Sequence, residues 1–308
     1  RKPALRSQGN DPLACECLTR LLFSALVDAD RLDTERFTQH HKADTRDSFR
    51  KKAPSVAELR GMLDTFIGEK SAAGQSYEVR SLRESVRLAC ERDSQLPRGM
   101  FTLNVPTGGG KTLASMNFAL RHAEKHGLRR VIVVEPYLSI IDQVAKEFRE
   151  AFGRLAVLEH HSLSTASPKS ARDENPTALD LAAENWSAPI IVTTTVQFFE
   201  SLFTDAPATS RKLHNLANSV VIFDEVQNFP RHLLLPLLAM LQQFSEFAGT
   251  SLVFMSATLP DFSATVQSAI RFGEYAAALP NNKPIQATLQ RFPPLHRISD
   301  AARPFTLA

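Results

Sequence analysis

The run Pro106-Thr107-Gly108-Gly109-Gly110-Lys111-Thr112 decides the fold of this chain. Residues 100–105 before it have the apolar character of a buried strand, and apolar residues recur at helical spacing over residues 113–126 after it. A strand, a glycine-rich turn and a helix N-terminus in this order present backbone N–H groups to an anion. A tight glycine turn followed by an ordinary surface lysine would not account for the flanking strand and helix. We therefore predict a phosphate-binding loop.

This loop is predicted to supply most of a site for ATP and Mg²⁺. Its glycines form the phosphate cradle, Lys111 reaches the β- and γ-phosphates, and the Thr112 hydroxyl holds Mg²⁺. The general pattern has a glycine five residues before Gly110, where this chain has Val105. A Pro-Thr-Gly-x-Gly-Lys-Thr run is the helicase form of such a loop. The predicted nucleotide-binding residues in it are Thr107, Gly108, Gly109, Gly110, Lys111 and Thr112.

An acidic pair follows another apolar run, at residues 220–223. Asp224 is predicted to bind the nucleotide's Mg²⁺ through water, and Glu225 to act as the general base toward the attacking water. Two acids at the end of a strand are common by chance. Together with the glycine-rich loop, however, they form a predicted catalytic set of Lys111, Asp224 and Glu225.

A third strand-end element is Ser256-Ala257-Thr258, which follows the apolar run 252–255. Short hydroxyl side chains at this place can sense the γ-phosphate and couple it to a moving partner domain. Ordinary turn chemistry explains a Ser-Ala-Thr run equally well, so both interpretations stay open for these three residues.

Apolar runs predict five strands of a mostly parallel sheet, at residues 100–105, 131–135, 190–194, 220–223 and 252–255. Helical patterns separate the strands at residues 113–126, 140–152, 196–203 and 233–247, so right-handed crossovers are expected. This alternation predicts a three-layer α/β sandwich. Residues 162–176, which are rich in Ser, Thr, Ala and Pro, are predicted to form a surface loop.

The first hundred residues are predicted to be largely helical, with helices over residues 15–27, 56–67 and 77–91. Residues 40–54 are polar and charged, and we predict an exposed connection there. A domain boundary is expected near residue 74. Arg80, Arg83 and Arg87 lie at helical spacing, which indicates either a solvated face or a contact of one arginine with the nucleotide.

Composition bounds the class of protein. Hydrophobic residues make up 43% of the chain and charged residues 22%, which fits a soluble globular protein, and a net charge of +3 neither requires nor excludes a nucleic-acid partner. Three cysteines cannot all pair and lack a second ligand pair for zinc, so we expect a reducing, cytoplasmic setting. The longest apolar run, 233–241, has about half of the roughly 20 residues of a spanning helix, so no membrane contact is expected.

These elements, in this order, resemble the superfamily 2 helicases. The glycine-rich loop matches their motif I, residues 224–227 match motif II with Gln227 in fourth place, and residues 256–258 match motif III. The resemblance implies a DExH-like RecA motor in which Gln227 joins the nucleotide-binding set. The CRISPR-associated helicase–nucleases of type I interference systems are similar in more detail, over residues 26–35, 104–112, 135–143 and 159–162.

That family implies an HD-type metal nuclease domain, which is all-α, followed by two RecA-like motor domains. The expected division is a helical nuclease part and linker over residues 1–73, the first RecA-like domain over 74–272, and the start of the second over 273–308. Asp30 lies where the family has its last metal-binding aspartate, although a solvated acidic helix end explains it without the resemblance. Because the chain has no His-Asp dipeptide, we expect an incomplete site for its divalent transition metal, in a sequence that begins inside the nuclease domain or lacks that activity.

The resemblance further implies single-stranded DNA as a substrate, gripped by its phosphates. The expected DNA contacts are Tyr137, Ser139, His161 and Thr195, although the pair His160-His161 is equally compatible with an unspecialised loop. A crRNA-guided surveillance complex is an implied partner, and a protein inhibitor is a further one that the resemblance allows. After Phe272 no arginine pattern of a second motor domain is found, so we expect ATP binding with poor hydrolysis. The competing hypotheses are a repair or restriction translocase and a nucleotide-switched binding module.

Overall fold

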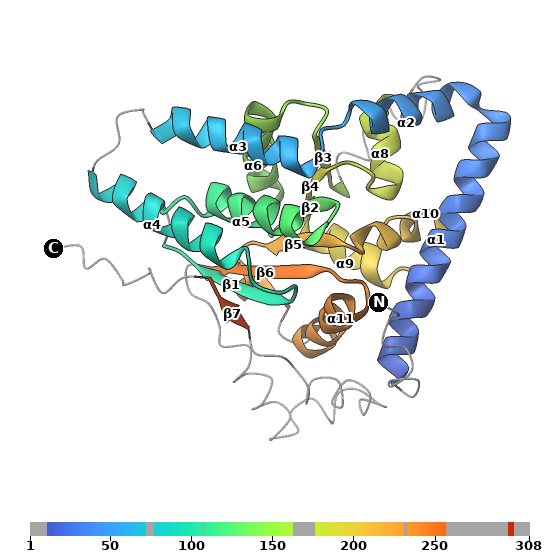
Figure 1. The fold of residues 1–308 in the computed structure, drawn as a ribbon. Coiled ribbons are helices and arrows are strands. Elements are labelled where there is room, and N and C mark those ends of the chain that lie inside the picture. Colours follow the sequence, from blue (N-terminus) through green and yellow to red (C-terminus); the bar gives the residue numbers. More distant parts are fainter. Residues whose placement is uncertain are drawn as a thin grey trace.

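The computed structural model describes residues 11–71, 77–106, 108–162, 176–230, 233–256 and 295–298. A parallel sheet of seven strands lies at its centre, in the order β3-β4-β2-β5-β6-β1-β7 (Figure 1). The strands are β1 (Met100–Asn104), β2 (Arg130–Glu135), β3 (Val157–His160), β4 (Ile190–Thr194), β5 (Ser219–Phe223), β6 (Ser251–Ser256) and β7 (His296–Arg297). The predicted α/β fold with a mostly parallel sheet is therefore confirmed.

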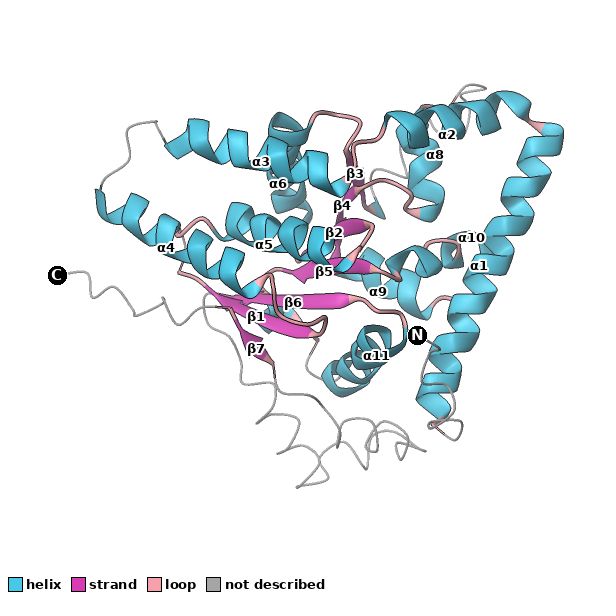
Figure 2. Cartoon of the chain, viewed as in Figure 1, coloured by secondary structure: helices cyan, strands magenta, loops and turns pink. Residues whose placement is uncertain are grey.

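Helices cover both faces of this sheet (Figure 2). They are α1 (Pro12–Thr38), α2 (His40–Lys52), α3 (Val56–Ser71), α4 (Tyr77–Asp93), α5 (Lys111–His126), α6 (Leu138–Phe152), α8 (Ala178–Asn185), α9 (Thr195–Phe203), α10 (Pro207–Ser210) and α11 (Leu234–Phe247). Two 3-10 turns, η1 (Leu213–Leu216) and η2 (Val226–Asn228), flank β5. All predicted strands and helices of the sheet region are present, whereas β3, β7, α8 and α10 were not predicted.

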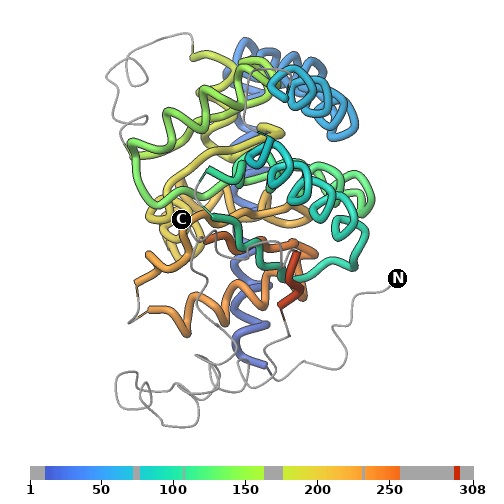
Figure 3. The backbone as a smooth tube through the Cα atoms, turned by 90° about the vertical axis from the view of Figure 1, so that its left-hand side faces the viewer, coloured from blue at the N-terminus to red at the C-terminus, as the bar shows by residue number. Residues whose placement is uncertain are grey.

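Strands β1 to β6 bury successive side chains in two hydrophobic clusters, one on each face of the sheet. In β2, Val131 and Val133 face the cluster with α3, α4, α5 and α6, while Ile132 and Val134 face the cluster with α8, α9 and α11. The same alternation holds in β5, because successive strand residues point to opposite faces. Figure 3 shows α11 on the opposite side of the sheet from α3, α4, α5 and α6. Burial on both faces explains why these strands are apolar throughout.

The N-terminal helix α1 is longer than predicted. It begins at Pro12, where the Asp11 side chain accepts hydrogen bonds from the backbone N–H groups of Leu13 and Ala14, and it continues to Thr38. The acidic residues 28–33 therefore lie inside this helix and not at its end. None of the described helices is long and apolar enough to span a membrane.

The predicted exposed connection at residues 40–54 is wrong, because α2 occupies His40–Lys52. Although its sequence is mostly polar, two of its side chains are buried, Phe49 and Arg46. The Arg46 guanidinium donates two hydrogen bonds to Glu35, at 2.7 and 3.1 Å, and one to the Leu181 carbonyl at 2.5 Å, and it also pairs with Glu184. A buried charge is tolerated when it is fully paired, which composition alone does not reveal.

The predicted boundary near residue 74 is not visible in the packing. Helix α3, which precedes it, contributes Leu59 and Leu63 to the same cluster as α5 and α6. At the other end, β7 pairs with β1, and Ile298 is buried in that cluster too. The division into residues 1–73, 74–272 and 273–308 stays a prediction, and most of the predicted loop 162–176 lies outside the described residues.

Candidate nucleotide-binding site

The glycine-rich loop connects β1 to the first turn of α5. Gly108 (φ 81°) and Gly110 (φ 78°) adopt left-handed backbone conformations that favour glycine, and Gly110 directly precedes α5. A Cβ atom at Gly109 would lie 2.5 Å from Cγ1 of Val105 and 2.9 Å from the Pro106 carbonyl oxygen. Each of the three glycines is therefore required by the observed backbone. The predicted residue Thr107 lies outside the described residues.

An arginine from α4 holds this loop from the side. The Arg83 guanidinium donates to the Gly108 carbonyl oxygen at 3.0 and 3.3 Å. Its neighbour Arg87 instead forms ion pairs with Glu84 and Glu91. Arg83 thus contacts the loop and Arg87 forms surface ion pairs, while a contact of one of these arginines with the nucleotide stays a prediction.

Lys111 meets the acidic pair at the end of β5. Its Nζ atom lies 2.6 Å from Oε1 of Glu225 and 3.6 Å from Oδ1 of Asp224. Asp224 donates its backbone N–H to the Val134 carbonyl, which places it at the carboxyl end of the sheet. Glu225 has a left-handed backbone (φ 47°), which is uncommon for a residue other than glycine and turns its side chain toward Lys111.

Burial and hydrogen bonding have different effects on the two acids. Burial raises the pKa of Asp224 above its usual value, and the nearby Lys111 charge offsets this only in part. Burial also acts to raise the pKa of Glu225, but hydrogen bonds from Lys111 and Gln227 outweigh it and lower the pKa overall. Glu225 is therefore an ionised, acceptor-only carboxylate at neutral pH.

A chain of hydrogen bonds links this pair to β6. Gln227 donates from Nε2 to Oε2 of Glu225 at 2.6 Å, and the Ser256 hydroxyl donates to Oε1 of Gln227 at 2.5 Å. Residues from the three predicted motifs are thus in direct contact through Lys111, Glu225, Gln227 and Ser256. Ala257 and Thr258 lie outside the described residues.

A buried carboxyl group that sequence reasoning missed lies behind the acidic pair. Glu135 ends β2, is 1% exposed, and its Oε2 has no hydrogen-bond partner in the described part of the chain. Burial, reinforced by the negative charge of Asp224, raises its pKa to about 8. The signal available in the sequence was an apolar strand that ends in an acid, as the run before Asp224 also does.

A cavity of about 1010 Å³ opens over these residues. It extends from the glycine-rich loop and the acidic pair to α4 and α6. The loop, the Lys111 ammonium group and two oxygen donors suited to Mg²⁺ share this space, because Gly108, Lys111, Thr112 and Asp224 all line it. The arrangement can hold a phosphate chain with its metal ion.

The residues predicted to contact DNA all follow strands that are neighbours in the sheet. Tyr137 and Ser139 are exposed at the start of α6, after β2, and half-buried Thr195 follows β4 and donates to the Glu135 carbonyl at 3.3 Å. His161, after β3, is buried, and its Nε2 atom lies 3.1 Å from Oε1 of Glu159. Parallel pairing brings these positions to one edge of the sheet, and their contact with DNA stays a prediction.

The structure does not bring Asp30 together with other metal ligands among the described residues. Asp30 is exposed on α1, whereas its neighbour Asp28 is 3% exposed and accepts hydrogen bonds from Arg211 at 2.8 Å and Asn185 at 3.0 Å. Asp28 therefore packs α1 against the sheet domain, and the role of Asp30 as a metal ligand remains a prediction.

Residues 91–266 match the DEAD/DEAH box helicase family, and the chain belongs to this family. The CRISPR-associated nuclease/helicase Cas3 of Haloferax volcanii is 28% identical over 195 residues, which cover 57% of this chain and 21% of that protein. The chain thus spans about a fifth of that relative. Among solved structures, T. fusca Cas3 is 21% identical with a TM-score of 0.49, covering 70% of this chain and 24% of that one. The predicted resemblance to CRISPR-associated helicase–nucleases is confirmed.

A pH-dependent stability is expected from Glu135. Between its ordinary pKa of 4.5 and about 8, the folded chain holds a proton that the unfolded chain loses, so stability falls as pH rises through this range. Glu135→Gln removes this dependence. We expect the wild type to lose on the order of a few kcal/mol more than the variant between pH 5 and pH 8, because each pKa unit is worth about 1.4 kcal/mol.

Urea unfolding with EDTA and without nucleotide measures this difference. Glu150→Gln, which removes an exposed carboxylate from α6, is the matched control and should keep the wild-type pH dependence. If the free energies of unfolding of the wild type and Glu135→Gln changed with pH in the same way, the raised pKa of Glu135 would be contradicted.

Proposed function

We propose that this chain carries the ATP-driven motor of a single-stranded-DNA translocase that works with a metal-dependent nuclease in CRISPR type I antiviral defence, in the cytoplasm. The observation that carries the proposal is the contact of Lys111 with Glu225 beside Asp224, at the glycine-rich loop. ATP hydrolysis needs a cation for the phosphates, a carboxylate on the metal side and a group that orients water. The similarity to the H. volcanii nuclease/helicase supports the biological setting.

Lys111 and Glu225 neutralise each other without nucleotide. The β- and γ-phosphates of ATP compete for Lys111, since an ammonium group prefers several anionic oxygens to one carboxylate oxygen. Glu225 is then released toward the γ-phosphate side, where its lowered pKa keeps it ionised and able to orient and deprotonate water. Gln227 stays bonded to Glu225 and transmits this movement to Ser256.

The donor set also fits Mg²⁺. The Thr112 hydroxyl and the Asp224 carboxylate are oxygen donors that line one cavity, and Mg²⁺ takes few protein ligands and keeps several waters. When bound, Mg²⁺ would supply positive charge that offsets the negative charge developing on the phosphates during hydrolysis. Thr112 and Asp224 are its proposed ligands.

DNA is proposed to run along the sheet edge formed by the carboxyl ends of β2, β3 and β4. Tyr137 and Ser139 offer an exposed ring and an exposed hydroxyl there, and Thr195 offers a half-buried hydroxyl. Ring stacking on bases and hydroxyl contacts with phosphates bind a strand with little sequence readout. A crRNA-guided surveillance complex, and a protein inhibitor, are proposed as further partners.

DNA-stimulated ATP hydrolysis tests the motor function. In the complete natural protein, single-stranded DNA is expected to increase the ATPase rate, and Lys111→Ala to lower it by about 100-fold or more, as loss of a preorganised charged group does. Lys125→Ala, an exposed lysine on the same helix, is the control and should be unaffected. ATPase activity that does not respond to DNA would favour a nucleotide-switched binding module.

The nuclease is proposed to use a divalent transition metal with Asp30 as one ligand, since its exposed carboxylate on α1 is accessible. Asp30→Ala should lower metal-dependent DNA cutting by the complete protein about 10- to 100-fold, the range for disturbed metal sites, and leave ATP binding unchanged. Asp33→Ala, also exposed on α1, is the matched control. Equal cutting by both variants and the wild type would remove Asp30 from the metal site.

A further inference from the structure

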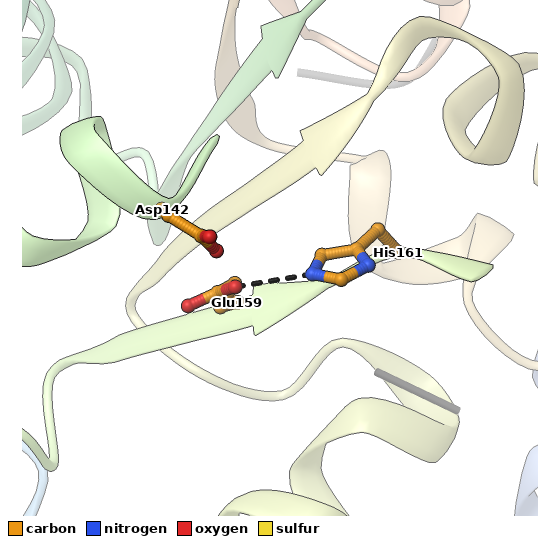
Figure 4. Close-up of side chains that lie close together, drawn as sticks. All are labelled: Asp142, Glu159 and His161. Atoms are coloured by element: carbon orange, nitrogen blue, oxygen red, sulfur yellow. Dashed lines mark hydrogen bonds and ion pairs between the residues drawn. The ribbon is translucent and has the colours of Figure 1, made fainter. Parts of the chain in front are cut away.

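Three side chains of metal-ligating types meet at the end of the edge strand β3, at the opposite end of the strand order from β7. One ligand atom each from Asp142, Glu159 and His161 lies within 4.8 Å of the other two. Figure 4 shows the three side chains facing a common space, with Glu159 between the other two. In the part of the chain that the structure describes, no other group of three such residues is this close.

The fold explains why these residues converge. Glu159 points to one face of the edge strand, and His161, directly after the strand, places its Nε2 atom 3.1 Å from Oε1 of Glu159. This face carries Val157, which belongs to the same hydrophobic cluster as α6. Helix α6 packs there and brings Asp142, from its second turn, over Glu159.

The group combines two carboxylates and one imidazole with a single paired arginine. Arg149 donates to Oε2 of Glu159 at 2.6 Å, while Oε1 of Glu159 faces Nε2 of His161 at 3.1 Å. Glu159 also lies close to Asp142, so two carboxylates face each other in this group. Two carboxylates this close repel each other when both are ionised, and a cation between them relieves the repulsion.

The three side chains differ in how deeply they are buried. His161 is buried, Glu159 is half-buried and Asp142 is exposed. The group is therefore anchored on the protein side and open on the solvent side. An ion held by three protein ligands would complete its coordination with water from that open side.

We propose that Asp142, Glu159 and His161 bind a divalent transition-metal ion that clips α6 to β3. The imidazole nitrogen disfavours Mg²⁺ and Ca²⁺, which take oxygen ligands, whereas the mixed nitrogen and carboxylate set suits Mn²⁺ or Zn²⁺. His161 then acts as a metal ligand and not as a direct contact to DNA. The competing account is a network of Arg149, Glu159 and His161 that needs no ion.

Binding of Mn²⁺ to the EDTA-treated chain, followed by the electron paramagnetic resonance signal of free Mn²⁺, tests the proposal without nucleotide. We expect one site that a tenfold excess of Mg²⁺ does not empty. Asp142→Asn and His161→Asn should each weaken Mn²⁺ binding by about tenfold or more, since even outer-shell changes at metal sites reach that size. Glu150→Gln, on the same helix, should bind Mn²⁺ as the wild type does.

A folding check and one further variant make the outcome decisive. Asp142 is exposed, so Asp142→Asn should fold normally, which circular dichroism checks even if His161→Asn does not fold. Asp224→Asn should keep the Mn²⁺ site, because it changes only the nucleotide site. Absence of Mn²⁺ binding, equal binding by Asp142→Asn and the wild type, or loss of binding in Asp224→Asn alone would overturn the proposal.

Discussion

The ion pair between Lys111 and Glu225 is the interaction on which the candidate nucleotide site depends. It joins the helix that follows β1 to the turn that follows β5, and hydrogen bonds through Gln227 extend it to the end of β6. These strands are neighbours in the order β5-β6-β1, and parallel pairing brings their carboxyl ends to one edge. This contact of 2.6 Å and the two hydrogen bonds of Gln227 therefore couple three segments that are far apart in sequence.

The surrounding structure keeps this contact in place. Phe223, directly before the acidic pair, packs against three other phenylalanine rings. Its ring centroid lies 5.1 Å from that of Phe198 and 5.4 Å from that of Phe229, both edge-on. It also stacks on Phe254, with 5.6 Å between the ring centroids. On the other side, Arg83 holds the Gly108 carbonyl, and Val105 packs so closely that only glycine fits at position 109. Val105, which stands where the general loop pattern has a glycine, thus packs against the loop.

Sequence patterns predicted those parts of the molecule that depend on neighbouring residues. The apolar strands and the loop of residues 106–112 each carry their signal within a few positions, so both were predictable. Helix α2 was missed because Arg46 is buried only by virtue of Glu35, Glu184 and the Leu181 carbonyl, which come from elsewhere in the chain. Strand β3 was missed because it has only four residues, of which only Val157 and Leu158 are apolar. Likewise, the burial of Glu135 and the grouping of Asp142 with His161 arise only from tertiary packing.

The central claim is that ATP binding breaks the ion pair between Lys111 and Glu225. Measuring how ATP and ADP bind to Glu225→Gln tests this most directly. Glutamine keeps the shape and the bond with Gln227 but removes the charge that competes with the γ-phosphate. Calorimetric titration with Mg²⁺ present should show ATP binding about tenfold tighter than to the wild type, the size of one charged hydrogen bond, with a smaller change for ADP. Weaker ATP binding to Glu225→Gln, or equal changes for ATP and ADP, would contradict this account.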